Sequence, residues 1–257
     1  MLEVRGLSKH FGGIRAVDDC SFKVEAGSIT ALIGPNGAGK TTAFNCISKT
    51  WPPTSGEVWL DGERIDRLRP YQVTHRGLSR TFQISRNLED LTVLENLVVQ
   101  SRIGHWHDLF GPAINAAERE KALDILDFLG ITRLADEETR SLSYGQKKLM
   151  DFGALLMSDP KIILLDEPAG GVNPRLLGEI VDRIRQLNGR GLTVFIVEHN
   201  MDVVMSLSQK VIVMAFGQVI AEGTPSEVQS NPEVLEAYLG GSDQGESAAA
   251  SAGAGHA

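Results

Sequence analysis

One glycine-rich segment constrains the fold of this chain more than any other stretch. Residues 34–42 read GPNGAGKTT and contain the pattern G-x-x-x-x-G-K-[ST]. Before them stands the apolar, β-branched stretch SITALI, which predicts a buried strand. After the glycines, KTTAFNCISK carries apolar residues at helical spacing, so we expect a helix there. A strand, a glycine loop and a helix in this order predict an α/β fold.

The residue types in this loop suit the binding of phosphate. Gly34, Gly37 and Gly39 let backbone N–H groups surround an anion, because no Cβ obstructs its approach. Lys40 is placed to reach the β- and γ-phosphates of a nucleotide, and the Thr41 hydroxyl to ligate Mg²⁺. The other residues of the predicted nucleotide loop are Pro35, Asn36, Ala38 and Thr42. The alternative is a chance glycine-rich turn, and the flanking strand and helix argue against it.

A pair of carboxylates could provide the metal ligand and the general base that a nucleotide site also needs. The stretch IILLDEP predicts a buried strand that ends at Asp166 and Glu167. Ligands bind at the carboxyl ends of parallel strands, so we expect Asp166 to hold Mg²⁺ through water. Glu167 is the candidate general base for an attacking water. The alternative is that both carboxylates are solvated side chains before a turn-forming proline. The presence of a phosphate loop in the same chain argues against this alternative.

The order of the remaining elements favours a parallel sheet with a helical insertion. Short strands and a hairpin are expected up to about residue 83, and GLTVFIVEH predicts a further buried strand after a helix in RLLGEIVDRIRQLNGRG. Between residues 91 and 130 the apolar residues follow helical spacing, and we expect a helical subdomain over about residues 91–158. Two short helices are predicted after residue 223, in TPSEVQSN and NPEVLEAYLGG.

Composition excludes several classes of protein. The net charge of −8 argues against a nucleic-acid binder, because phosphate backbones require a basic face. No apolar run is long enough to span a bilayer and none near residue 1 resembles a secretory signal, so we expect a soluble chain. Cys20 and Cys46 lack metal-ligand spacing and are expected as buried, reduced thiols. The tail at 242–257 is of low complexity and predicted to be disordered.

The stretch SLSYGQKKLM, residues 141–150, predicts the start of a helix. Ser143 can cap it, and Gly145 leaves bare backbone in its first turn. A helix N-terminus of this kind suits an anion, although an ordinary serine cap explains the same residues. Further along, Gly153 should cost the helix about 0.8–1 kcal/mol relative to alanine. His105 and His107 form HWH, which we interpret as a loop with incidental histidines, because a metal site needs more ligands.

Five motifs in one order, GPNGAGKTT, TFQ, LSYGQ, ILLDEP and VEH, make the chain resemble the ATP-binding subunit of an ABC transporter. The resemblance runs over residues 1–241 and implies one ATPase domain. Its fold would be a P-loop NTPase core with a mostly parallel sheet, an N-terminal antiparallel β subdomain and an inserted α-helical subdomain. It implies ATP and Mg²⁺ as cofactors. It also implies a second ATPase subunit, identical or paralogous, whose ATP site Ser143 and Gly145 would complete.

Four further roles come from the resemblance alone. Gln83 resembles the glutamine that contacts Mg²⁺ and the attacking water, and His199 the histidine on the γ-phosphate. Phe11 resembles the aromatic residue that stacks on adenine, with a core phenylalanine as the alternative. Asn173 lies in the loop that couples the two sites, where an aspartate is frequent. Taken alone, His199 would be an ordinary surface or core histidine.

The class of transporter is inferred from less specific sequence similarities. The stretches FGGIRAVDD and IAEGTPSEVQSNPEVLEAYLG, with a tyrosine in the signature, resemble branched-chain amino-acid importers, and the long segment after residue 99 resembles the longer of their two ATPase subunits. Alternatives are urea or amide importers, the ATPase of lipopolysaccharide export, a soluble ABC ATPase, or a small-molecule kinase. The implied partners are permease subunits, gripped by residues 83–97, and indirectly a solute-binding protein, at the cytoplasmic face of the inner membrane.

Overall fold

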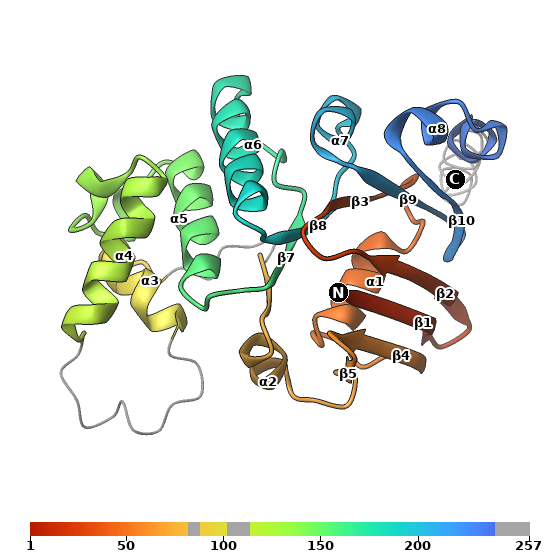
Figure 1. Cartoon of the computed structure of the whole chain (residues 1–257), viewed down its shortest axis with the longest axis horizontal. Coiled ribbons are helices and arrows are strands. Elements are labelled where there is room, and N and C mark those ends of the chain that lie inside the picture. Colours follow the sequence, from red (N-terminus) through yellow and green to blue (C-terminus); the bar gives the residue numbers. More distant parts are fainter. Residues whose placement is uncertain (82–87, 102–113, 240–257) are drawn as a thin grey trace, which may run out of the picture. The chain divides into compact units, whose positions relative to one another are not determined.

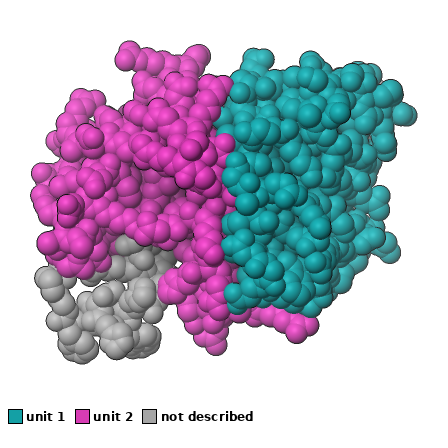
Figure 2. All heavy atoms as spheres, in the orientation of Figure 1, with its two compact units in different colours: residues 1–66, 196–257 teal, residues 67–195 magenta. Residues whose placement is uncertain are grey.

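The computed structural model describes residues 1–81, 88–101 and 114–239 of the chain (Figure 1). The polypeptide divides into two compact units, one of residues 1–66 and 196–257 and the other of residues 67–195 (Figure 2). The predicted tail at 242–257 lies outside the described residues. None of the helices in the described part of the chain combines the length and apolar character needed to cross a bilayer.

The first unit contains an antiparallel sheet near the N-terminus. Its strands are β1 (Leu2–Phe11), β2 (Ile14–Val24), β4 (Ser55–Leu60) and β5 (Glu63–Arg64). They lie in the order β2-β1-β4-β5, with Leu2 opposite both Val24 and Leu60. Trp59 lies opposite Arg64 in an antiparallel pair, which confirms the hairpin expected before residue 83.

The same unit contains the strand that precedes the glycine loop. Its other strands are β3 (Ile29–Ile33), β9 (Lys210–Ala215) and β10 (Gln218–Gly223), and its helices are α1 (Lys40–Ile47), α7 (Met201–Leu207) and α8 (Pro225–Gln229). β3 runs parallel to β9, and β10 pairs with β9 antiparallel. All five residues of β3 are buried, which confirms the predicted core strand. The second predicted terminal helix is present at residues 232–239.

The second unit combines short strands with the longer helices. Its strands are β6 (Leu78–Arg80), β7 (Ile162–Asp166) and β8 (Thr193–Val197), in the order β8-β7-β6, and the division between the units falls inside β8. β6 and β7 are parallel. Helix α2 (Pro70–His75) precedes β6, and α6 (Pro174–Gly189) follows β7. Asn173 caps α6, because its Oδ1 accepts a hydrogen bond from the Leu176 amide at 2.9 Å.

Three helices between β6 and β7 form a bundle of their own. They are α3 (Val93–Ser101), α4 (Ala116–Phe128) and α5 (Tyr144–Leu156), and each packs on the other two (Figure 1). Apolar residues recur at the helical spacing i, i+3, i+4 and i+7 along α4 and at its C-terminal end, and all four are buried: Ala122, Ile125, Leu126 and Leu129. A Cβ at Gly153 would lie 2.9 Å from Leu129 Cδ1, so this glycine allows the neighbouring helix to approach α5.

These elements confirm the α/β class with its antiparallel N-terminal sheet and inserted helices. The domain boundaries at residues 91, 158 and 241 stay predictions. The elements α2, α7 and β10 were not predicted from the sequence, because they are short and carry weak periodicity.

Candidate functional site

The glycine loop lies directly between β3 and α1, as predicted. Gly34, Gly37 and Gly39 have φ angles of +149°, +79° and +97°. A Cβ at Gly34 would overlap the Met214 carbonyl oxygen, and one at Gly39 the Ala16 carbonyl oxygen. Two of the three glycines therefore serve the fold itself, because neighbouring backbone occupies the space of a side chain.

Hydrogen bonds hold the loop in this shape. The Gly217 amide donates to the Ala38 carbonyl oxygen at 3.1 Å, which joins the loop to the β9–β10 turn. The Lys40 ammonium donates to the carbonyl oxygens of Gly34 and Pro35 at 2.8 and 2.9 Å. The Lys40 ammonium therefore lies against the backbone of its own loop. Elsewhere in the loop, Asn36 is exposed while Thr41 and Thr42 are half-buried.

Phe11 ends β1 and is not a core residue. Its side chain is 44% exposed, and its ring meets that of Trp51 edge to face, with centroids 5.3 Å apart. The Lys9 ammonium lies 5.0 Å from the centroid of the same ring. These contacts argue against the alternative of a core phenylalanine and leave the ring partly open to solvent.

His199 follows β8 in the first unit and is exposed. The buried side chain of Glu198 accepts hydrogen bonds from the backbone amides of His199 and Asn200, both at 3.1 Å. Asn200 in turn caps α7. A buried carboxylate therefore fixes the backbone from which the His199 imidazole projects.

In the second unit, Asp166 ends β7 with a buried carboxylate. Its Oδ2 accepts a hydrogen bond from Arg80 Nη2 at 2.8 Å, and its amide donates to the Thr81 hydroxyl at 3.1 Å. Among the described residues, Oδ1 of the same carboxylate is buried and has no hydrogen-bond partner. An orphaned buried carboxylate oxygen fits a water or cation that the predicted role of Asp166 requires.

Glu167 begins the turn after β7 with a left-handed backbone, at a φ of +48°. Its side chain is half-buried. Its carbonyl oxygen accepts a hydrogen bond from the Gly170 amide at 2.9 Å, which closes the turn. A glutamate in this region is uncommon, so the turn holds the residue against its intrinsic preference.

The predicted helix start is confirmed. Ser143 caps α5, where its Oγ accepts from the Gln146 amide at 3.4 Å and its own amide donates to Gln146 Oε1 at 2.8 Å. Ser143 is exposed. A Cβ at Gly145 would overlap Leu176 Cδ2 of α6, so this glycine has a structural reason within the chain in addition to the predicted approach of a ligand.

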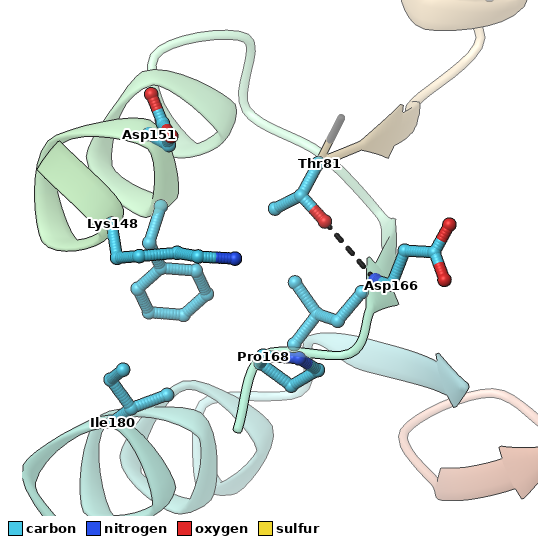
Figure 3. A pocket seen from close by; sticks show the side chains of 8 residues that line it. Thr81, Lys148, Asp151, Asp166, Pro168 and Ile180 are labelled. Atoms are coloured by element: carbon cyan, nitrogen blue, oxygen red, sulfur yellow. Dashed lines mark hydrogen bonds between the residues drawn. The ribbon is translucent and has the colours of Figure 1, made fainter. Parts of the chain in front are cut away.

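A small pocket opens between α5, β7 and α6 within the second unit (Figure 3). Its lining residues are Thr81, Lys148, Asp151, Phe152, Leu165, Asp166, Pro168 and Ile180. Figure 3 shows the Lys148 ammonium extending into the hollow, whereas the Asp166 carboxylate points away from it. The pocket is therefore a mainly apolar hollow behind the Asp166 backbone, separate from its carboxylate.

Two predicted features lie outside the described residues: Gln83, and the histidines His105 and His107. Within the described part of the chain, no cluster of three or more His, Cys, Asp or Glu side chains could hold a metal. Two contacts were not predicted from the sequence: Arg80 with Asp166, and Tyr144 with Gly170 in the turn after Glu167. The arginine next to the TFQ motif was visible, but its partner lies 86 residues away.

Comparison with known proteins gives two matching family models. One, described as ABC transporter, matches residues 17–170, and the other, described as branched-chain amino acid ATP-binding cassette transporter, matches residues 218–244. A probable branched-chain amino acid transport ATP-binding protein LivG of Archaeoglobus fulgidus is 40% identical over 95% of this chain and 96% of its own. The high-affinity counterpart BraF of Pseudomonas aeruginosa is 39% identical, over 93% and 98%.

Solved structures resemble the fold throughout. A nucleotide-free ATP-binding cassette from an ABC transporter has a TM-score of 0.84 at 35% identity, covering 92% of this chain and 98% of that one. A cassette in its ADP conformation has a TM-score of 0.83 at 37% identity, covering 93% and 98%. The ABC transporter model covers more than half of the residues, and the relatives match at 39–40% identity over almost the whole chain, which therefore belongs to the ATP-binding subunits of ABC transporters.

Proposed function

We propose that this chain hydrolyses ATP to drive an importer of branched-chain amino acids. One observation carries the proposal: the similarity to LivG and BraF proteins extends over almost the whole length of both chains. The family model at residues 218–244 supports the same class of solute, because it describes branched-chain amino acid cassettes. Relatives that carry urea, amides or lipopolysaccharide are the alternatives that a transport assay must exclude.

The nucleotide is held by the loop between β3 and α1. Backbone N–H groups of residues 37–41 would donate to the phosphates, and the positive end of α1 would favour their charge. Lys40 would exchange its bonds to the Gly34 and Pro35 carbonyl oxygens for the β- and γ-phosphates. Phe11 would stack on the adenine through its exposed part.

Mg²⁺ would be held by the Thr41 hydroxyl, by Gln83 and, through water, by Asp166. Oδ1 of Asp166 is the oxygen available for that water, because Oδ2 is bonded to Arg80. When bound, the cation neutralises negative charge on the phosphates. Arg80 orients the Asp166 carboxylate through its hydrogen bond to Oδ2.

Hydrolysis needs a group that accepts a proton from water. Glu167 would orient and polarise the attacking water, a role that contributes about 10²–10⁴-fold in rate. The exposed imidazole of His199 would contact the γ-phosphate from a backbone fixed by Glu198. Ser143 and Gly145 would present the N-terminus of α5 to the γ-phosphate of a second ATPase subunit, so that two cassettes close head to tail over two ATP molecules.

We propose that residues 83–97 contact a helix of the permease. Closure of the two ATPase subunits would be transmitted to the permease through this contact. Leu88 in that segment is 48% exposed and offers an apolar contact. The chain would therefore act as a peripheral subunit at the cytoplasmic face of the inner membrane, with a solute-binding protein as an indirect partner.

Glu167→Gln tests the chemistry, with Glu179→Gln as the matched control, because the Glu179 side chain is exposed on α6. We expect Glu167→Gln to keep ATP binding, to lower hydrolysis at least about 100-fold and to accumulate an ATP-bound dimer in size-exclusion chromatography. Glu179→Gln should behave like the parent. Wild-type hydrolysis by Glu167→Gln, or only monomer with ATP and Mg²⁺, would contradict the proposed site. The solute is tested in membrane vesicles that contain this chain and the membrane subunits that co-purify with it. These vesicles should take up leucine when ATP is supplied. Uptake of urea and not of leucine would reject branched-chain amino acids as the transported solute.

A further inference from the structure

Tyr144 joins the signature end of α5 to the loop that follows Glu167. It is the first residue of α5, directly after the cap Ser143. Its hydroxyl donates a hydrogen bond to the Gly170 carbonyl oxygen at 3.2 Å, across 26 residues of sequence. Both ends of this contact lie in the second unit.

The contact is close at the hydroxyl end of the ring. A Cβ at Gly171 would lie 3.2 Å from Tyr144 Cε1 and 3.3 Å from its hydroxyl oxygen. Gly171 has a φ of +71°, so a side chain there would strain the backbone as well as crowd the ring. The tyrosine thus lies against bare backbone, and it remains 55% exposed. A ring present only to fill a core would be more fully buried.

The same loop positions Glu167. The Gly170 amide donates to the Glu167 carbonyl oxygen, and a Cβ at Gly170 would lie 3.9 Å from Glu167 Oε2. Gly170 therefore contacts Tyr144 through its carbonyl group and the Glu167 backbone through its amide. The two peptide groups that flank the Gly170 Cα thus link the start of α5 to the turn that holds Glu167 in a left-handed conformation.

We propose that Tyr144 is a positioning residue that couples the phosphate-sensing end of α5 to the hydrolytic turn of the same subunit. The inference rests on the proposed function, in which Ser143 meets one ATP and Glu167 acts on the other. Engagement of Ser143 by the opposing subunit's γ-phosphate then sets Glu167 at this subunit's own site, through the Tyr144–Gly170 hydrogen bond. Such coupling would make the two sites of the dimer hydrolyse ATP cooperatively.

Tyr144→Phe tests the coupling, because it keeps the ring and removes only the donor. Tyr71→Phe is the matched control: Tyr71 lies on α2 in the same unit and is 37% exposed. ATP hydrolysis is measured over a range of ATP concentrations, in the full chain assembled with its membrane subunits. We expect Tyr144→Phe to lower kcat about 2–10-fold, to leave KM within about twofold and to bring the Hill coefficient toward 1. Tyr71→Phe should match the parent.

A double variant shows whether Tyr144 acts through Glu167. In the Glu167→Gln background, Tyr144→Phe should not lower the residual rate further, since the group that it positions is already lost. The inference would be overturned if Tyr144→Phe lowered the rate of the Glu167→Gln variant by the same factor as that of the parent. It would also be overturned if Tyr144→Phe alone left kcat and the Hill coefficient unchanged, or changed only KM. The proposed function fails separately: it is rejected if Glu167→Gln alone hydrolyses ATP normally, and it stands if only Tyr144→Phe is without effect.

Discussion

The ion pair between Arg80 and Asp166 allows a quantitative prediction. The arginine side chain is 7% exposed and the carboxylate 0%, with 2.8 Å between Nη2 and Oδ2. Arg80→Met keeps much of the apolar volume and leaves the Asp166 charge buried without its partner. Removing one member of a buried pair costs about 3–5 kcal/mol, because the remaining charge has lost its water and its counterion. We expect a loss of that size in the free energy of unfolding.

Arg140→Met is the matched control, because Arg140 pairs with Glu138 and Asp90 at side-chain exposures of 58%, 47% and 91%. Exposed pairs contribute about 0–1 kcal/mol, since water and salt screen them. Urea unfolding followed by fluorescence measures both variants, without nucleotide. The double variant Arg80→Met/Asp166→Asn should regain part of the loss, because no unpaired buried charge remains. The reasoning is refuted if Arg80→Met costs no more than Arg140→Met.

Two other substitutions and one chemical probe test the remaining geometry. Gly34→Ala places a Cβ on the Met214 carbonyl oxygen and should weaken ATP binding at least about tenfold by calorimetry, or 1.4 kcal/mol. Gly178→Ala, whose Cβ meets nothing within 4 Å, should keep the affinity and stabilise α6 by about 0.5–1 kcal/mol. Burial raises the pKa of the Cys20 and Cys46 thiols to about 11, so only about 0.1% is thiolate at pH 8. Iodoacetamide should therefore alkylate the folded chain far more slowly than the chain in guanidinium, and equally fast reaction would contradict this burial.

Local patterns were enough to predict much of the fold and part of the site. The strand before the glycine loop, the helix after it and the buried strand that ends at Asp166 all follow from apolar runs and glycine spacing. The cap Ser143 was equally visible, because a capping box involves residues only three positions apart. The roles of Gln83 and of the dimer came from the resemblance and stay proposals.

The packing role of two glycines could not be predicted from the local sequence. Gly153 was expected only to weaken α5, yet it allows Leu129 and Ile125 to pack on that helix. Gly145 was assigned to an approaching nucleotide, yet Leu176 of the same chain already fills the space beside it. A propensity describes one residue in its own helix, whereas these costs and gains depend on which helix packs next to it.

By itself, the amino-acid sequence determined where the glycine loop lies between a strand and a helix and that a buried strand ends at Asp166, because such features depend on residues that are neighbours in the chain. The tertiary structure alone decided that Arg80 pairs with Asp166 and that Tyr144 contacts Gly170. Those partners are separated by 86 and 26 residues, and only the packing of strands and helices brings their atoms within hydrogen-bond distance.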